Sequence, residues 1–109
     1  MIDRISQLLR FLDEDPTDPF LMFAVAQEYA TAGEREQALG RYLQLRDAHP
    51  EYVATYYHLG MLYEAINSPA EAAETYRDGI DAAKEQGDNH ALRELMAAAE
   101  ALKARNDEI

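Results

Sequence analysis

Residues 56–65 read YYHLGMLYEA and bring tyrosine, histidine and methionine side chains together within ten positions. Imidazole and thioether groups can ligate a metal ion, and crowded aromatic rings can hold a cofactor. The same residue types also fill the buried face of a helix. The choice between these interpretations decides which kind of function the chain has.

Other residues that could do chemistry give little support to a metal site or an enzyme. The three histidines, His49, His58 and His90, lack the one-turn spacing by which a helix presents two imidazoles to a metal. Carboxylate pairs such as Glu71 and Glu74 have no nucleophile near them and are expected to form a solvated face. The glycines form no phosphate-binding fingerprint, and cysteine is absent. We therefore expect no enzymatic activity, no metal and no cofactor.

Length and composition favour a single helical domain that covers residues 1–109. The chain is 48% hydrophobic, and its apolar residues are mainly alanine, leucine and tyrosine, which favour helix over strand. The formal net charge of −11 repels nucleic acid and anionic membrane surfaces. No apolar run approaches the roughly 20 residues of a membrane span, and residues 1–16 lack the apolar core of a signal peptide. The expected location is cytoplasmic.

The acidity has two interpretations. Aspartate and glutamate outnumber lysine and arginine by 21 to 10, and most of the basic residues are arginine. This excess is explained by ordinary solubility, and a sharper hypothesis is adaptation to high salt, where self-repulsion would be screened. A melting temperature that does not change between low and molar KCl would exclude the second interpretation.

The sequence repeats itself after 34 residues. This shift places Tyr29 on Tyr63, Ala38 on Ala72 and Tyr42 on Tyr76. Glycine or asparagine stands at the same phase of both copies, where a helix must end in a left-handed residue. The repeats cover residues 19–52 and 53–86.

Helical periodicity and the residues that start and stop helices predict two helices in each repeat, with one further helix before the first repeat and one after the second. Asp18 and Pro19 begin a helix that ends before Gly33, and Ser68 with Glu71 forms a predicted capping box. The expected helices are 3–13, 19–32, 35–48, 52–66, 69–86 and 89–104. The first belongs to a half-repeat at 3–16, where Leu8 and Phe11 share the phase of Tyr42 and Leu45, and the last is expected to cap the stack.

This pattern resembles the tetratricopeptide repeat, a helix-turn-helix unit with large, small and tyrosine residues on its first helix and alanine and an aromatic residue on its second. The chain is similar to small stand-alone bacterial members. The resemblance implies antiparallel helix pairs stacked in a right-handed superhelix. It also assigns repeat packing to Ala26, Tyr29, Ala38 and Tyr42, and to Tyr56, Leu59, Gly60, Tyr63, Ala72 and Tyr76.

The family resemblance also implies a concave groove formed by the first helix of each repeat, in which partner peptides bind. The positions transferred to this sequence are Phe20, Phe23, Gln27, Tyr57, Met61 and Glu64. Members that hold acidic chaperone tails use lysine and arginine at comparable positions. Residues 11–34 and 47–76 contain neither, so the expected partner is an apolar or basic segment of another protein.

Two functions follow from the groove. The first is a non-enzymatic adaptor that binds a peptide or a partner segment. The alternative is a structural homo-oligomer, such as a homodimer, that associates through the same groove. Nucleic acid and membrane are not expected partners.

Overall fold

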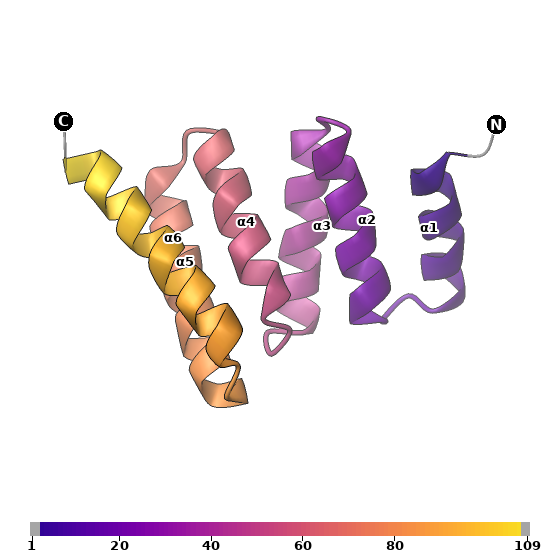
Figure 1. Cartoon of the computed structure of the whole chain (residues 1–109). Helices are drawn as coiled ribbons and strands as arrows, with labels where there is room; N and C mark the ends of the chain where they lie inside the picture. The colour runs from indigo at the N-terminus through magenta and orange to yellow at the C-terminus, as the bar shows by residue number, and fades with distance from the viewer. Residues whose placement is uncertain (1–2, 108–109) are drawn as a thin grey trace. The chain divides into compact units, whose positions relative to one another are not determined.

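The computed structural model describes residues 3–107, and these residues form six α-helices without strands. The helices are α1 (Arg4–Glu14), α2 (Pro19–Thr31), α3 (Arg35–Ala48), α4 (Ala54–Ala65), α5 (Pro69–Gln86) and α6 (Asn89–Asp107), as labelled in Figure 1. The all-α class is confirmed. The expected domain range of 1–109 includes residues 1–2 and 108–109, which lie outside the described residues.

The helices fall into two compact units of three. The first unit contains α1 to α3 and ends at Pro50, and the second begins at Glu51 and contains α4 to α6. Within each unit, consecutive helices run antiparallel (Figure 1).

The turn residues place the helix ends where the sequence predicts them. Gly33 and Gly87 have φ of 81° and 68°, and Asn67 has φ of 61°. Asn67 is the one non-glycine residue with positive φ among residues 3–107, and asparagine tolerates this conformation better than most side chains. Since a left-handed residue stops helical hydrogen bonding, these three positions fix the ends of α2, α4 and α5.

The helix starts are partly as predicted. The Asp18 carboxylate accepts hydrogen bonds from the backbone N–H groups of Phe20, at 2.8 Å, and Leu21, at 3.4 Å, so it caps α2 ahead of Pro19. The capping box predicted at Ser68 is wrong, because its side chain makes no cap hydrogen bond. Pro69 still marks the start of α5, because its fixed φ suits the first helical position.

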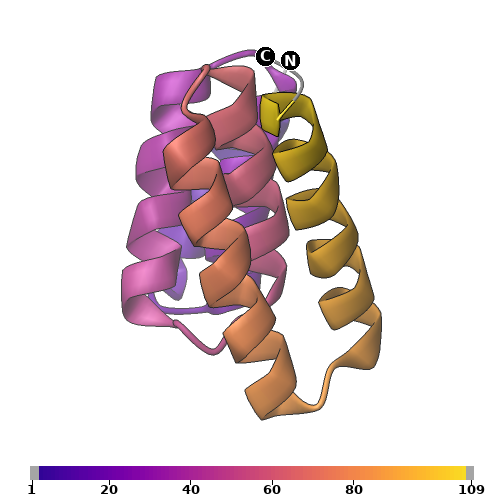
Figure 2. The ribbon, with the colours of Figure 1, turned by 90° about the vertical axis from the view of Figure 1, so that its left-hand side faces the viewer.

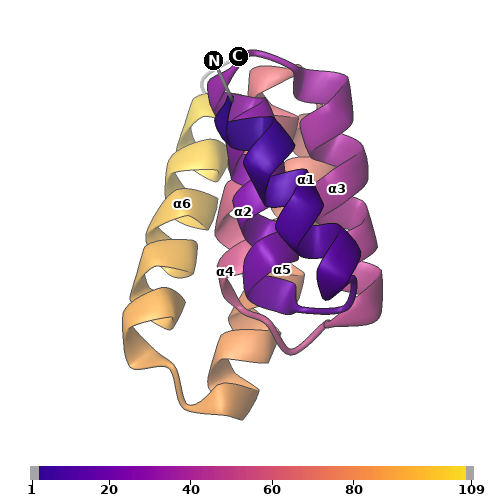
Figure 3. The ribbon, with the colours of Figure 1, turned by 90° about the vertical axis from the view of Figure 1, so that its right-hand side faces the viewer.

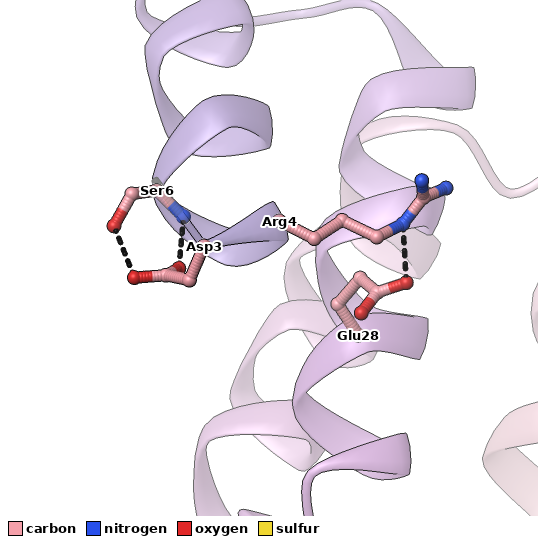
Figure 4. A network of polar contacts seen from close by, with 4 residues as sticks. All are labelled: Asp3, Arg4, Ser6 and Glu28. Atoms are coloured by element: carbon pink, nitrogen blue, oxygen red, sulfur yellow. Dashed lines mark hydrogen bonds and ion pairs between the residues drawn. The ribbon is translucent and has the colours of Figure 1, made fainter. Parts of the chain in front are cut away.

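The first helix packs mainly against α2 in the first unit (Figure 3). Leu12 is buried, whereas Phe11 is 52% exposed. The predicted common phase of Phe11 and Leu45 is therefore wrong for burial: α1 buries a narrow stripe against one main neighbour, and Phe11 lies beside that stripe. Arg4 Nε donates to Glu28 Oε1 at 2.5 Å and connects α1 with α2 (Figure 4).

A local cap orders the start of α1. Asp3 accepts hydrogen bonds from the backbone N–H of Ser6 at 2.8 Å and from its hydroxyl at 3.0 Å (Figure 4). Both bonds favour the charged carboxylate and lower the pKa of Asp3. The Asp3 carboxylate thus pairs the Ser6 N–H, a first-turn donor that has no partner within the helix.

The α2–α3 pair of the first unit encloses small and aromatic side chains. Ala26 and Ala38 are fully buried, and their small size permits close approach of the helices. The Tyr42 ring meets Phe23 edge-on, with centroids 6.1 Å apart, and burial raises the pKa of Tyr42 to about 12. Tyr29 is half-buried, and the Arg41 guanidinium lies 5.9 Å from the centre of its ring.

In the second unit, glycine makes room for large neighbours at two places. The Tyr76 ring of α5 lies against the backbone of Gly60 in α4. Gly79 of α5 similarly accepts Tyr56 of α4 and Leu95 of α6. These contacts leave no space for a Cβ atom, so the two glycines set the closeness of the helix packing.

The last helix completes the second unit by forming a hairpin with α5 (Figure 2). Leu95 and Leu102 are buried in a core that also includes Tyr56 and Tyr76. The helix runs to Asp107, three residues beyond the predicted end at 104.

Candidate partner-binding groove

A cleft of about 390 Å³ lies between α4 and α6 in the second unit. The α4 wall consists of Tyr57, Met61 and Glu64. The α6 wall consists of Glu94, Ala97, Ala98, Ala101 and Arg105. Most of the lining is apolar, with charged groups on both walls, so the cleft is suited to an apolar side chain flanked by polar groups.

The stretch YYHLGMLYEA divides between the core and this cleft. Tyr56, Leu59 and Gly60 are buried. Tyr57 and Met61, four positions apart and therefore on the same helix face, line the cleft. The aromatic and thioether groups thus form packing and a surface cleft.

Tyr57 and Met61 differ in how far the protein covers them. Met61 is 46% exposed, whereas Tyr57 is half-buried and packs against the core cluster of the second unit. Replacing Tyr57 would therefore disturb the core as well as the cleft. Met61 is the better position at which to test the cleft alone.

Glu64 is held by two side chains at one end of the cleft. The Tyr76 hydroxyl donates to Glu64 Oε2 at 2.5 Å, and Arg105 Nη2 donates to Glu64 Oε1. Burial raises the pKa of Tyr76, and the hydrogen bond to the Glu64 carboxylate raises it further, so the phenol remains a donor. Glu64 therefore connects a core residue of α5 with the end of α6.

The α6 wall was not part of the predicted site. Glu94, Ala97 or Ala98, Ala101 and Arg105 recur every three or four residues, which places them on one helix face. That spacing is a usable signal, although the last helix is predicted only to cap the stack. Arg105 also brings a basic group to a groove predicted to lack one.

The predicted groove positions of the first unit lie on α2. Phe20 is 65% exposed, while Phe23 and Gln27 are half-buried. Phe23 contacts Tyr42, as described above, so its ring is partly committed to packing. Phe20 is the most accessible of the three.

A second cleft of about 380 Å³ adjoins the first and shares Tyr57 and Glu94 with it. Its other polar lining residues are His58, Asp88 and His90. The rings of Tyr57 and His58 meet edge-on with centroids 5.5 Å apart, and His90 Nε2 lies 3.6 Å from Glu94 Oε1. The lining contains no lysine or arginine, so its fixed charges are carboxylates.

Burial lowers the pKa of His58 below its usual 6.5, and the nearby Glu94 carboxylate offsets part of that effect. Between the lowered pKa and 6.5 the unfolded chain binds more protons than the folded chain, so acidification through this window lowers the free energy of unfolding. We expect His58→Gln to reduce this pH dependence, measured by urea unfolding at pH 7.5 and pH 5.5. An equal change in the free energy of unfolding between the two pH values, in the variant and in the wild type, would contradict the prediction.

Across residues 3–107, no three histidine, aspartate or glutamate side chains are grouped so that they could hold a metal ion. No helix in the same range is both long and apolar enough to cross a membrane.

Solved structures provide the comparisons that identify the fold. The solution structure of a tetratricopeptide repeat domain protein from Salinibacter ruber is 39% identical, covers 82% of this chain and 90% of that chain, and has a TM-score of 0.79. A crystal structure of a tetratricopeptide repeat domain protein from the same organism is 40% identical over 79% of this chain and 97% of that one, with a TM-score of 0.76.

A third solved structure matches nearly the whole chain. It is a Bordetella parapertussis protein, 25% identical over 98% of this chain and 92% of that chain, with a TM-score of 0.83. No family model and no curated protein sequence matches.

Proposed function

Because the chain belongs to the tetratricopeptide-repeat family, we propose that it is a non-enzymatic adaptor that binds a segment of another protein. The observation that carries this proposal is the apolar cleft between α4 and α6, in which Met61 is 46% exposed and Tyr57 half-buried. An exposed methionine beside an aromatic ring provides adaptable apolar area, which suits a peptide.

The domain division belongs to the same proposal. It consists of a half-repeat at 3–16, repeats at 19–52 and 53–86, and a closing helix at 89–104, within one domain. Phe20, Phe23 and Gln27 are proposed to contact the partner as well. A cytoplasmic location and the absence of nucleic-acid, membrane and cofactor binding complete the proposal.

The test is selection of short random peptides, displayed on phage, against the immobilised full chain. We expect Met61→Glu to lower the affinity for the selected peptides by roughly tenfold, because a charge replaces apolar contact area in the cleft. Met96→Glu is the matched control, since Met96 is 50% exposed on α6 but does not line the cleft. Peptides that bind both variants equally well would place the binding site elsewhere.

Light scattering separates the adaptor from the homo-oligomer. A monomeric wild type at high protein concentration supports the adaptor. A dimer that Met61→Glu dissociates, while Met96→Glu does not, would mean that a second copy occupies the cleft.

A further inference from the structure

The groove between α4 and α6 continues beyond the first cleft in both directions. The cleft that contains Met61 shares Tyr57 and Glu94 with its neighbour at the start of both helices. It shares Glu64 and Arg105 with a third cleft, of about 330 Å³, at their ends. All three clefts lie within the second unit, and the first shares two lining residues with each of the others.

The length of this groove matches a short extended segment. The 12 residues of α4 span about 18 Å at 1.5 Å per residue. An extended chain advances roughly 3.3 Å per residue, so about five residues of a partner fit along it.

Charge is distributed unevenly along the groove. At the start, the lining has the carboxylates of Asp88 and Glu94 and no lysine or arginine. In the middle, Met61, Ala97 and Ala101 present apolar surface. At the end, the positive charge of Arg105 is paired directly with the carboxylate of Glu64. Because the start has two carboxylates and no lysine or arginine, whereas the end has an ion pair, the excess negative charge lies at the start.

We propose that the groove between α4 and α6 binds an extended segment with a lysine or arginine in the cleft beside Glu94 and an apolar side chain over Met61. This inference rests on the proposed adaptor function and adds the chemistry and the placement of the segment. Glu94 is half exposed, and its Oε1 lies 3.6 Å from His90 Nε2. Its exposed carboxylate can also reach a cation in the cleft, and Tyr57 provides an aromatic ring at the boundary of the two clefts.

The carboxylates at the start of the groove select the sign of the partner's charge. Asp88 already accepts a hydrogen bond from the backbone N–H of Ala91 at 3.0 Å, which leaves Glu94 as the more adaptable acceptor. An acidic segment would meet repulsion at this position, and an entirely apolar segment would leave the carboxylate without compensation.

The experiment uses the peptides selected on the wild-type full chain from the phage-displayed random library. We expect the Met61-dependent peptides to be enriched in a basic residue a few positions from an apolar residue. Glu94→Gln should lower the affinity for these peptides about fivefold, and Glu94→Lys should lower it by roughly tenfold or more. Glu100→Gln is the control, because this exposed acid of α6 lies outside the groove lining and should leave affinity unchanged.

The outcomes separate this inference from the proposed function. Peptides that depend on Met61 but have no basic residue, or that bind Glu94→Lys as well as the wild type, would overturn the inference and leave the adaptor function standing. Peptides that do not depend on Met61 would overturn both. An equal loss of affinity in Glu94→Gln and Glu100→Gln would mean that the preference for basic peptides comes from the net charge of −11 and not from Glu94. That result would also overturn the inference.

Discussion

Gly60→Ala is expected to lower the free energy of unfolding by about 2 kcal/mol or more, although alanine is the better helix former. A Cβ at Gly60 would lie 2.7 Å from Tyr76 Cδ1 and closer still to Cε1. The Tyr76 ring is fully buried, and its hydroxyl is hydrogen-bonded to Glu64. The ring therefore cannot move aside without giving up core packing and that bond. Urea unfolding of the full chain measures the change.

Gly40→Ala is the matched control for this prediction. Gly40 also lies inside a helix, α3, but it is exposed and a Cβ there would meet nothing within 4 Å. The same substitution should therefore raise the free energy of unfolding by roughly 0.5–1 kcal/mol, the usual helical advantage of alanine over glycine. Equal stabilisation by both variants would mean that the space at Gly60 is not filled as the structure indicates.

The helix ends at left-handed residues were predictable because the signals for them are local, whereas the helix expected from Tyr52 begins at Ala54. A left-handed residue ends a helix whatever surrounds it, so Gly33, Asn67 and Gly87 could be identified from the sequence. Asp18 followed by Pro19 is likewise a local start signal. The failed capping box at Ser68 shows the limit of such patterns, since a side chain that can cap need not do so.

The α6 wall of the groove was not predictable in the same way. Glu64 and Arg105 are 41 residues apart, and their contact depends on how α6 crosses α4. The repeat pattern does not specify that crossing, because Glu94 and Ala97 depart from the residues that a further repeat would require. The periodicity of the last helix indicates which residues share a face, but the neighbours of that face come from the packing of Leu95 and Leu102.

The attachment of α6 is therefore the structural condition for the groove. Apart from its turn with α5, the helix is held by Leu95 and Leu102, by half-buried residues near them, and by Arg105 on Glu64. The ion pair joins a largely exposed Arg105 to a mostly buried Glu64, so solvent screens only its Arg105 side. Apolar packing by Leu95 and Leu102 supplies the rest of the attachment.

Leu95→Ala is accordingly expected to lower the free energy of unfolding by roughly 3 kcal/mol and to loosen the α6 wall. Leu95 is 1% exposed and lies against the backbone at Gly79, beside Tyr56, so its removal leaves a cavity that the surrounding helices cannot readily fill. Urea unfolding measures the cost, and hydrogen exchange should show faster exchange of the α6 amides than of the α4 amides.

Met96→Ala is the control on the same helix, since Met96 is 50% exposed and its loss should change stability by no more than about 0.5 kcal/mol. Similar costs for the two variants would show that Leu95 does not hold α6 in place. A large cost without faster exchange in α6 would show that the wall unfolds only together with the rest of the second unit. In that case the groove is as stable as its core, and a partner segment would meet a preformed site instead of ordering one.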